Sequence, residues 1–286
     1  MVGKVDGWPA RLLVAIDESQ TADRAVSLSL GLASRHGSEL VFATAVNHAA
    51  IVAECAVPQG ALDPTPILDA LDDAARAVLA AVRERARAAG CAATCALLDG
   101  APAEAILRHA EVCGAGAIVV GSQGKGALKR FFLGSTAEGV LRGARVPVIV
   151  VPPGDADVSR AFRSITVALD RSDPAAHAAA FARSLARAEG AELTYCCVIG
   201  KPEERAAARA ALERAIAPKA PPGPAAREFI VEGEPVAEIL RVAESERADA
   251  IVAGYHAGHA VAHRFLGSVA AGILRRADRP VVVVPH

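Results

Sequence analysis

The sequence is poor in aromatic residues: one tryptophan, two tyrosines and seven phenylalanines make up 3% of its 286 residues. Apolar residues still account for 52% of the chain, so alanine, valine and leucine have to form the core. Small aliphatic side chains of this kind are typical of helices packed closely on a parallel sheet. At ~150 residues per domain, the length predicts two domains, each large enough to bury its own core.

The net charge is also close to zero. The chain has 31 lysines and arginines against 32 aspartates and glutamates, a formal charge of −1, so no overall field draws it to nucleic acid or to acidic lipid. No run approaches the ~18 consecutive apolar residues that a membrane helix needs. The first residues lack the basic and then apolar pattern of a signal peptide. We therefore expect a cytoplasmic protein that binds neither nucleic acid nor membrane.

Cysteine pairs at redox or metal-binding spacing are absent. The six cysteines are Cys55, Cys91, Cys95, Cys113, Cys196 and Cys197. None forms a Cys-x-x-Cys motif, and the adjacent Cys196 and Cys197 lie in an apolar, strand-like run. The pattern favours small apolar side chains in a reducing compartment over a disulfide framework or a metal site.

What the sequence does contain is an internal repeat. The run RLLVAID, which ends at Asp17, is matched by SITVALD, which ends at Asp170, 153 residues later. Further along the chain, Gly121 is matched by Gly254, 133 residues later. The smaller offset means that the first copy holds about twenty extra residues between these points. One ancestral domain has been duplicated.

The two copies join in the run PPGDADVSR, residues 152–160. Prolines, a glycine and aspartates are typical of a linker, so we expect domains at residues 1–154 and 155–286. The extra residues of the first copy fall at NHAAIVAECAVPQGALDPTP, residues 47–66. The sequence alone assigns no role to this insertion.

Each copy alternates apolar, strand-like runs with alanine-rich amphipathic segments of helical spacing. The strands are apolar throughout, and prolines lie near helix starts and beside the last strand. Such strands are buried on both faces, which indicates a parallel sheet with helices on each side. Right-handed crossovers then predict two tandem, doubly wound α/β domains.

One segment stands where such a sheet binds ligands. The run AIVV is followed at once by GSQGKGALKRFFLGST, residues 121–136. In a doubly wound sheet, ligands bind beyond the carboxyl ends of the strands, and glycines let backbone N–H groups approach an anion. Lys125, Lys129 and Arg130 would add positive charge, and a helix start would add a partial positive charge. A phosphate group fits this chemistry.

The common phosphate motifs do not match this segment. Gly124-Lys125 is followed by glycine, which excludes a Walker A loop, and no set of glycines gives G-x-G-x-x-G. The spacing present is Gly121, Gly124 after two residues, and Gly134-Ser135 after nine more. It resembles the G-x2-G-x9-G-S/T signature of the universal stress protein family, and the resemblance covers the whole chain as two such domains.

The resemblance implies a five-stranded parallel sheet of order 3-2-1-4-5 in each domain. It also implies ATP as the ligand of the first domain, with Mg²⁺ accompanying the phosphates. The implied nucleotide-binding residues are Ala15, Asp17, Ala45, Val120, Gly121, Gly124, Gly134, Ser135 and Thr136. Ala45 departs from the family, whose members usually place a valine there against adenine.

Structural interpretations of the same residues stay open. Ser135 begins the run STAE, which also fits a helix capping box with Glu138. Asp17 fits a helix cap after a strand, and the glycines fit a turn. On these interpretations the chain is a structural or partner-binding stress protein that binds no nucleotide.

The second copy departs from the signature. Its segment reads GYHAGHAVAHRFLGSVA, so Ala257 stands where the first copy has its second glycine, and Tyr255 replaces a small serine. An added methyl group clashes if the backbone there requires a positive φ, and the local positive charge is lower. A second nucleotide site is therefore less favoured than the first. Its residues would be Asp170, Val198, Gly254, Gly267 and Ser268.

Histidines in that segment suggest two other chemistries. The run from His256 to His259, HAGH, resembles the HxGH signature of nucleotidylyltransferases, but it follows the fourth strand and not the first. His256, His259 and His263 also have a spacing that fits a metal site, but no carboxylate or cysteine ligand lies nearby in the sequence. Drift within a duplicated loop explains the HAGH run better.

The sequence thus predicts a nucleotide-binding regulatory or interaction module and not a dedicated enzyme. Apart from Asp17, nothing marks a strong general base near the expected γ-phosphate, so at most slow ATP hydrolysis is expected. We also expect the domains to pack as an intrachain pseudo-dimer through their last strands, VPVIVVP and RPVVVVP. A homodimer of the whole chain is a further expectation.

Overall fold

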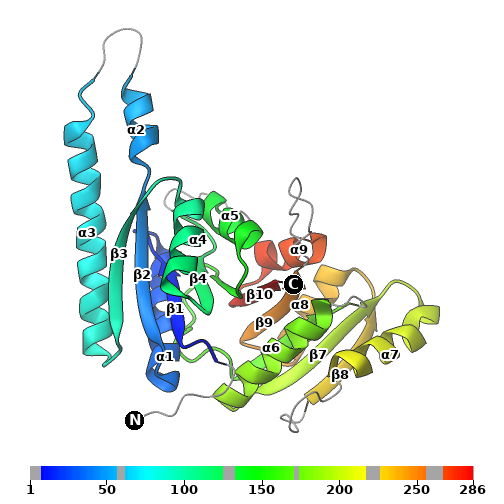
Figure 1. Cartoon of the computed structure of the whole chain (residues 1–286). Coiled ribbons are helices and arrows are strands. Elements are labelled where there is room, and N and C mark those ends of the chain that lie inside the picture. Colours follow the sequence, from blue (N-terminus) through cyan, green and yellow to red (C-terminus); the bar gives the residue numbers. More distant parts are fainter. Residues whose placement is uncertain are drawn as a thin grey trace.

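A computed structural model describes residues 8–56, 62–124, 133–170, 174–216, 226–255 and 267–285 of the chain. Within these residues, ten strands form one continuous sheet (Figure 1). The strands are β1 (Arg11–Ala15), β2 (Glu39–Val46), β3 (Ala93–Asp99), β4 (Ala117–Gly121), β5 (Val148–Val151), β6 (Ser164–Leu169), β7 (Glu192–Ile199), β8 (Ala226–Glu232), β9 (Ala250–Tyr255) and β10 (Val281–Pro285).

The order of the strands repeats across the sheet. It is β3-β2-β1-β4-β5 in the first half and β10-β9-β6-β7-β8 in the second. Each half therefore has the expected order 3-2-1-4-5, and all pairs within a half are parallel. The halves meet where β5 and β10 pair antiparallel, with Val282 opposite Ile149. The prediction of two tandem, doubly wound α/β domains is confirmed.

Helices cover both faces of this sheet. They are α1 (Gln20–His36), α2 (His48–Cys55), α3 (Thr65–Ala88), α4 (Pro102–Cys113), α5 (Ser135–Gly143), α6 (Pro174–Glu189), the short η1 (Pro202–Glu204), α7 (Arg205–Ile216), α8 (Pro235–Ser245) and α9 (Ser268–Arg276). Helices α1, α3, α6 and α7 contribute to the core on one face, and α4, α5, α8 and α9 to the core on the other. None of the described helices has the length and apolar character needed to cross a membrane.

Strand β1 shows how the apolar runs produce these layers. Leu12 and Val14 are buried in the core on the α1 side, and Leu13 and Ala15 are buried on the α4 side. Neighbouring residues of a strand point to opposite faces, so a strand covered on both faces needs apolar residues throughout. Each fully buried leucine or valine stabilises the fold by about 1.5–3 kcal/mol before the entropy of ordering is counted.

The segment that joins the domains packs against α1. The Arg24 side chain donates hydrogen bonds to three carbonyl oxygens of residues 152–156. A methyl group at Gly31 would lie 2.1 Å from the carbonyl oxygen of Ser159, so only glycine allows the segment to approach α1 this closely. The boundary expected at residue 154 falls within this segment and stays a prediction.

A buried polar cluster connects α1 to α6. Glu189 accepts a hydrogen bond from Arg35 at 2.8 Å, and its other oxygen lies 2.6 Å from Nε2 of His36. The side chains of His36 and Glu189 are 2% and 0% exposed, and the Trp8 ring lies against His36 with centroids 4.7 Å apart. His36 and Glu189 are corresponding residues of the two copies, 153 positions apart. The two equivalent helices therefore meet at their carboxyl ends, out of contact with water.

The cysteines are present as thiols. None of the six, all of which lie in described parts of the chain, forms a disulfide. Cys55, Cys196 and Cys197 are buried, and the other three are half-buried. Burial raises the pKa of the Cys196 thiol to about 12, so this thiol is not ionised or reactive at neutral pH.

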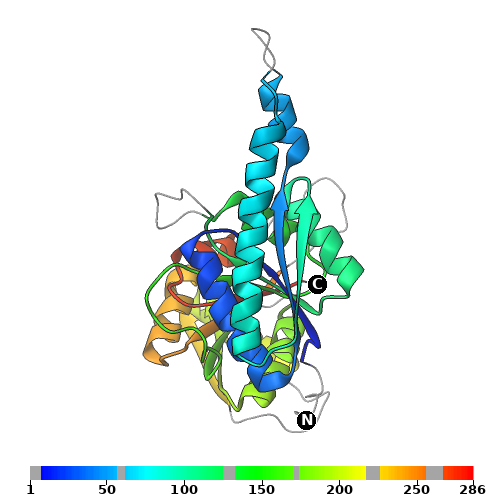
Figure 2. The ribbon, with the colours of Figure 1, turned by 90° about the vertical axis from the view of Figure 1, so that its left-hand side faces the viewer.

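The extra residues of the first domain form an arm. Helix α2 and the first part of α3 project together beyond the ends of the strands (Figures 1 and 2). The described residues 47–56 and 62–76 are referred to as the arm. At its base, His48 lies between two carboxylates, with Nε2 2.9 Å from Asp72 of α3 and Nδ1 3.0 Å from Asp99 of β3. These contacts connect α2 both to α3 and to the sheet.

We expect the His48 imidazole to titrate above its ordinary pKa of 6.5. The hydrogen bond to Asp72 is the main cause of the raised pKa, and Asp99 adds to it. Because the folded-state pKa is raised, this contact contributes fully below pH 6.5 and is lost as the pH rises past the folded value. NMR titration should give a midpoint that Asp72→Asn lowers. An unchanged midpoint in that variant would show that the contact does not form in solution.

Candidate functional site

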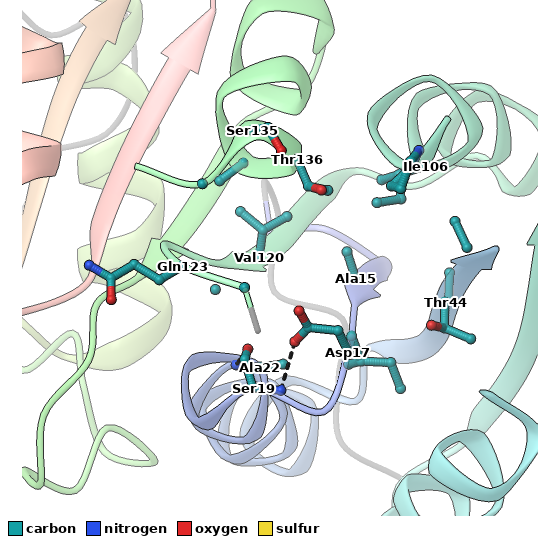
Figure 3. Close-up of a pocket in the computed structure, with 18 residues that line it drawn as sticks. Ala15, Asp17, Ser19, Ala22, Thr44, Ile106, Val120, Gln123, Ser135 and Thr136 are labelled. Atoms are coloured by element: carbon teal, nitrogen blue, oxygen red, sulfur yellow. Dashed lines mark hydrogen bonds between the residues drawn. The ribbon is translucent and has the colours of Figure 1, made fainter. Parts of the chain in front are cut away.

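A cavity of about 400 Å³ opens at the carboxyl ends of β1, β2 and β4 (Figure 3). The starts of α1, α4 and α5 close its sides. Ligands bind at this point of a doubly wound sheet because the crossovers on the two sides of β1 diverge there. Nine predicted residues all line the cavity: Ala15, Asp17, Ala45, Val120, Gly121, Gly124, Gly134, Ser135 and Thr136.

Two glycines of the signature lie in close contacts, which require glycine at Gly121 and leave little space for a side chain at Gly124. A methyl group at Gly121 would lie 2.4 Å from the Thr21 hydroxyl oxygen, and one at Gly124 would lie 3.1 Å from a carboxylate oxygen of Asp17. Neither glycine has a positive φ, so the reason is space and not backbone conformation. Thr21 also donates a hydrogen bond to the carbonyl oxygen of Gln123. This bond holds the backbone after β4 against the start of α1.

Helix α5 begins at the edge of the cavity without a side-chain cap. Gly134 is the cap residue, and Ser135 is already the first residue of the helix. Glu138 pairs with Arg142, so the capping-box interpretation of Ser135 is wrong. The first N–H groups of a helix have no acceptor within it and carry a partial positive charge. This end of the cavity therefore suits an anion.

Asp17 follows β1 and lies on the opposite side of the cavity from Ser135 and Thr136 (Figure 3). One of its carboxylate oxygens accepts a hydrogen bond from the Ser19 N–H at 2.9 Å. Ser19 is the residue that caps α1, because its hydroxyl accepts a bond from the Ala22 N–H at 3.1 Å. The helix-cap interpretation of Asp17 is therefore wrong, and its carboxylate lines the cavity.

The second domain has a smaller cavity at the corresponding place, of about 140 Å³. Asp170, Val198 and Gly254 line it, whereas Gly267 and Ser268 are not among the described residues that do. Sites for small organic ligands usually measure ~300–1,000 Å³. By this measure the first cavity has room for such a ligand, and the second, as the described residues line it, is below this range.

Several predicted features lie outside the described residues. They are Lys125, Lys129, Arg130, His256, Ala257, His259 and His263. The positive charge expected beside the first site, the HAGH run and the histidine metal site therefore stay untested. Within the described parts of the chain, no group of three or more His, Cys, Asp or Glu side chains could hold a metal ion.

Comparison with known families identifies the repeated unit. The chain matches the family model described as "Universal stress protein family" over residues 10–152 and again over residues 161–285. The chain belongs to the universal stress protein family. The two matches fall on the two halves of the ten-stranded sheet, so this is a universal stress protein with two tandem domains.

Known universal stress proteins match either one domain or both. Universal stress protein YxiE of Bacillus subtilis (strain 168) is 30% identical over 145 residues, which are 49% of this chain and 97% of that protein. A universal stress protein from Thermus aquaticus is 34% identical over 135 residues, 43% of this chain and 98% of that protein. The crystal structure of a universal stress protein from Archaeoglobus fulgidus DSM 4304 covers 96% of this chain and 98% of its own, with 26% identity and a TM-score of 0.78. The tandem arrangement therefore has a counterpart of nearly the same extent.

Sequence patterns miss some residues around the cavity of this universal stress protein. Thr44 at the end of β2 and Ile106 in α4 both line it. Ile106 follows Pro102, another lining residue, by four positions, so both lie on one face of α4. That spacing could have identified Ile106 once α4 was placed over β2. Thr44 lies in an otherwise apolar strand and has no such signal.

Proposed function

We propose that the first domain of this universal stress protein binds ATP in the cavity of about 400 Å³. The observation that carries the proposal is the division of the cavity into two ends. One end has the uncapped start of α5, and the other has apolar side chains. A nucleotide is divided in the same way, with charged phosphates at one end and a flat base at the other.

The phosphates would lie at the start of α5. The N–H groups of Ser135, Thr136 and Ala137 need acceptors that the helix does not supply, and phosphate oxygens are suitable ones. Gly124 has no side chain, so its backbone lets the phosphates approach closely. The Ser135 hydroxyl adds one more donor. These groups act as a cradle of donors, and the helix start supplies partial positive charge.

The base would lie at the apolar end. Ile106 of α4 projects into the cavity there (Figure 3), and its side chain can pack on the face of a ring. Val120 of β4 lies nearer the start of α5, where the ribose and phosphates would lie. Ala45 and Ala15 leave room for the base because their side chains are small. Thr44 supplies a hydroxyl at this end, which gives the base a polar partner as well as apolar walls.

ATP would act here as a regulatory ligand and not as the substrate of a fast reaction. Asp17 is the only titratable side chain among the described residues that line the cavity, so strong general-base catalysis is not expected. Mg²⁺ commonly binds through phosphates, water and one or two carboxylates, and Asp17 is the carboxylate that the cavity offers. We expect hydrolysis to be slow at most.

The proposal includes a cytoplasmic location and further self-association. Cysteine thiols fit a reducing compartment, which is also where ATP is plentiful. Strands β5 and β10 already pair within one chain, so a homodimer would have to use another surface. Sedimentation velocity distinguishes the single chain from the dimer.

Mass spectrometry of the nucleotide released from gently purified protein tests the proposal. We expect ATP to be the main nucleotide recovered. Recovery of another adenine nucleotide would support the site but assign it a different ligand. No nucleotide in the released fraction, followed by no ATP binding in solution, would overturn the proposal and favour a scaffold that binds partners only.

A further inference from the structure

The arm carries apolar side chains that the rest of the chain leaves exposed. They are Val52, Leu62, Ile67 and Leu71, with exposed fractions of 45%, 64%, 43% and 39%. Ile67 and Leu71 are four residues apart, so they lie on one face of α3. Monomeric proteins rarely leave large apolar side chains gathered in water, and such patches mark interaction sites. The arm therefore has the character of a docking surface.

The same face of α3 leads into a groove beside α1. Val78 and Val82 of α3 and Val26 of α1 line this groove, which has a volume of about 230 Å³. Val78 follows Leu71 by seven residues, or two helical turns, and stays on the same face. Val82 and Val26 are themselves buried in the core, so the accessible stripe runs from Ile67 to Val78 and is roughly 16 Å long at 1.5 Å per residue. It can accommodate about three turns of a partner helix.

Carboxylates border this stripe, and the arm has no lysine or arginine before its last residue, Arg76. No lysine or arginine occurs in the sequence between Arg35 and Arg76. The carboxylates of the arm are Glu54, Asp63, Asp69, Asp72 and Asp73. Glu54 and Asp69 are exposed and form no ion pair within the described residues. A partner of the arm therefore needs apolar side chains flanked by positive ones.

We infer that the arm docks a basic amphipathic helix of a partner protein. The apolar face of that helix would cover the Ile67–Val78 stripe, and its lysines and arginines would face the carboxylates of the arm. The same charge disfavours other occupants. A second copy of the arm would place like charges opposite each other, and nucleic acid or acidic lipid would be repelled. The inference is independent of nucleotide binding.

A pair of synthetic peptides tests the inference with the full chain. One peptide of about 18 residues (five helical turns) has leucines on one helical face and lysines on the other, and the second has glutamates in place of the lysines. Fluorescence anisotropy in about 150 mM salt should show binding of the lysine peptide. The glutamate peptide should bind at least ~10-fold more weakly, a difference of about 1.4 kcal/mol.

Variants of the arm identify the surface. Ile67→Ser/Leu71→Ser and Glu54→Lys/Asp69→Lys should each weaken binding of the lysine peptide at least ~10-fold. All four side chains are exposed, so the fold should be retained, and circular dichroism checks this. Val112→Ser is the matched control because Val112, on α4, is 82% exposed. It should leave binding unchanged.

Three results would overturn the inference. They are no binding of the lysine peptide, equal binding of both peptides, and equal affinity in the wild type and the arm variants. A wild-type dimer in sedimentation velocity that Ile67→Ser/Leu71→Ser dissociates would assign the arm to a second copy of the chain instead.

Discussion

Replacing Gly134 by valine should weaken ATP binding at least ~100-fold, equivalent to about 2.7 kcal/mol. A Cβ at Gly134 would lie 3.4–3.5 Å from the backbone of residues 122–124. The branches of valine would fill the space between that backbone and the start of α5, where the proposed phosphates bind. The φ of −65° and ψ of 150° at Gly134 are accessible to valine, so the fold should be retained. Calorimetric titration of both proteins measures the change.

The second domain provides a matched control. Gly267 precedes α9 as Gly134 precedes α5, and a methyl group at Gly267 meets no described atom within 4 Å. Gly267→Val should therefore leave ATP affinity unchanged. Wild-type affinity in Gly134→Val would contradict the assignment of the phosphates to this loop. An equal loss of ATP affinity in Gly134→Val and Gly267→Val would mean that the loss does not arise in the first cavity.

Replacing Glu189 by alanine should lower the free energy of unfolding by about 3 kcal/mol, because removal of one member of a buried pair leaves its partners unsatisfied. Glu189 is completely buried and contacts both Arg35 and His36. Without it, the Arg35 guanidinium loses its carboxylate and the buried His36 loses its hydrogen-bond partner. Urea unfolding followed by circular dichroism measures the loss.

Two further variants distinguish the loss of the buried Glu189 contacts from the general effect of removing a carboxylate. Glu192→Ala removes a carboxylate that is 75% exposed and lies 3.8 Å from Arg227, so its expected cost is only ~0–1 kcal/mol. Glu189→Gln should cost less than Glu189→Ala because its amide oxygen still accepts a hydrogen bond. Equal costs for Glu189→Ala and Glu192→Ala would mean that the buried pair does not hold the domains together.

Most of the fold could be predicted because its signals are local or repeated. Apolar runs such as RLLVAID are long enough to indicate strands buried on both faces, and the offsets between Asp17 and Asp170 reveal the duplication. The order of the strands in the sheet, in contrast, could not be predicted from such signals. Alternating strands and helices are compatible with several orders, so the order 3-2-1-4-5 depended on the family resemblance. The structure confirms it.

The candidate site could be located from spacing, but the roles of its residues could not all be assigned. The pattern Gly121 to Ser135 places one loop beside the end of β1, and the nine residues named from it share one cavity. The alternative role of Ser135 as a helix cap was wrong because the helix begins one residue earlier than a capping box requires, and its role in nucleotide binding stays a prediction. Thr44 and Ile106 were missed because tertiary packing brings their elements together, which no local pattern records.

The arm is the part of the fold that the sequence predicts least. Its sequence reveals an insertion, but its direction depends on contacts between His48, Asp72 and Asp99, which are far apart along the chain. Only the structure shows that Ile67 and Leu71 remain exposed after folding. Apolar residues at helical spacing would otherwise predict a buried face.

The number of ATP molecules bound per chain tests the central claim most directly. Calorimetric titration of ATP into nucleotide-free protein should give one site per chain. Of the two corresponding cavities at the carboxyl ends of the strands, the first measures about 400 Å³ and the second, as the described residues line it, about 140 Å³. A stoichiometry of zero would contradict nucleotide binding by this protein. A stoichiometry of two would contradict the assignment of that binding to the first domain alone.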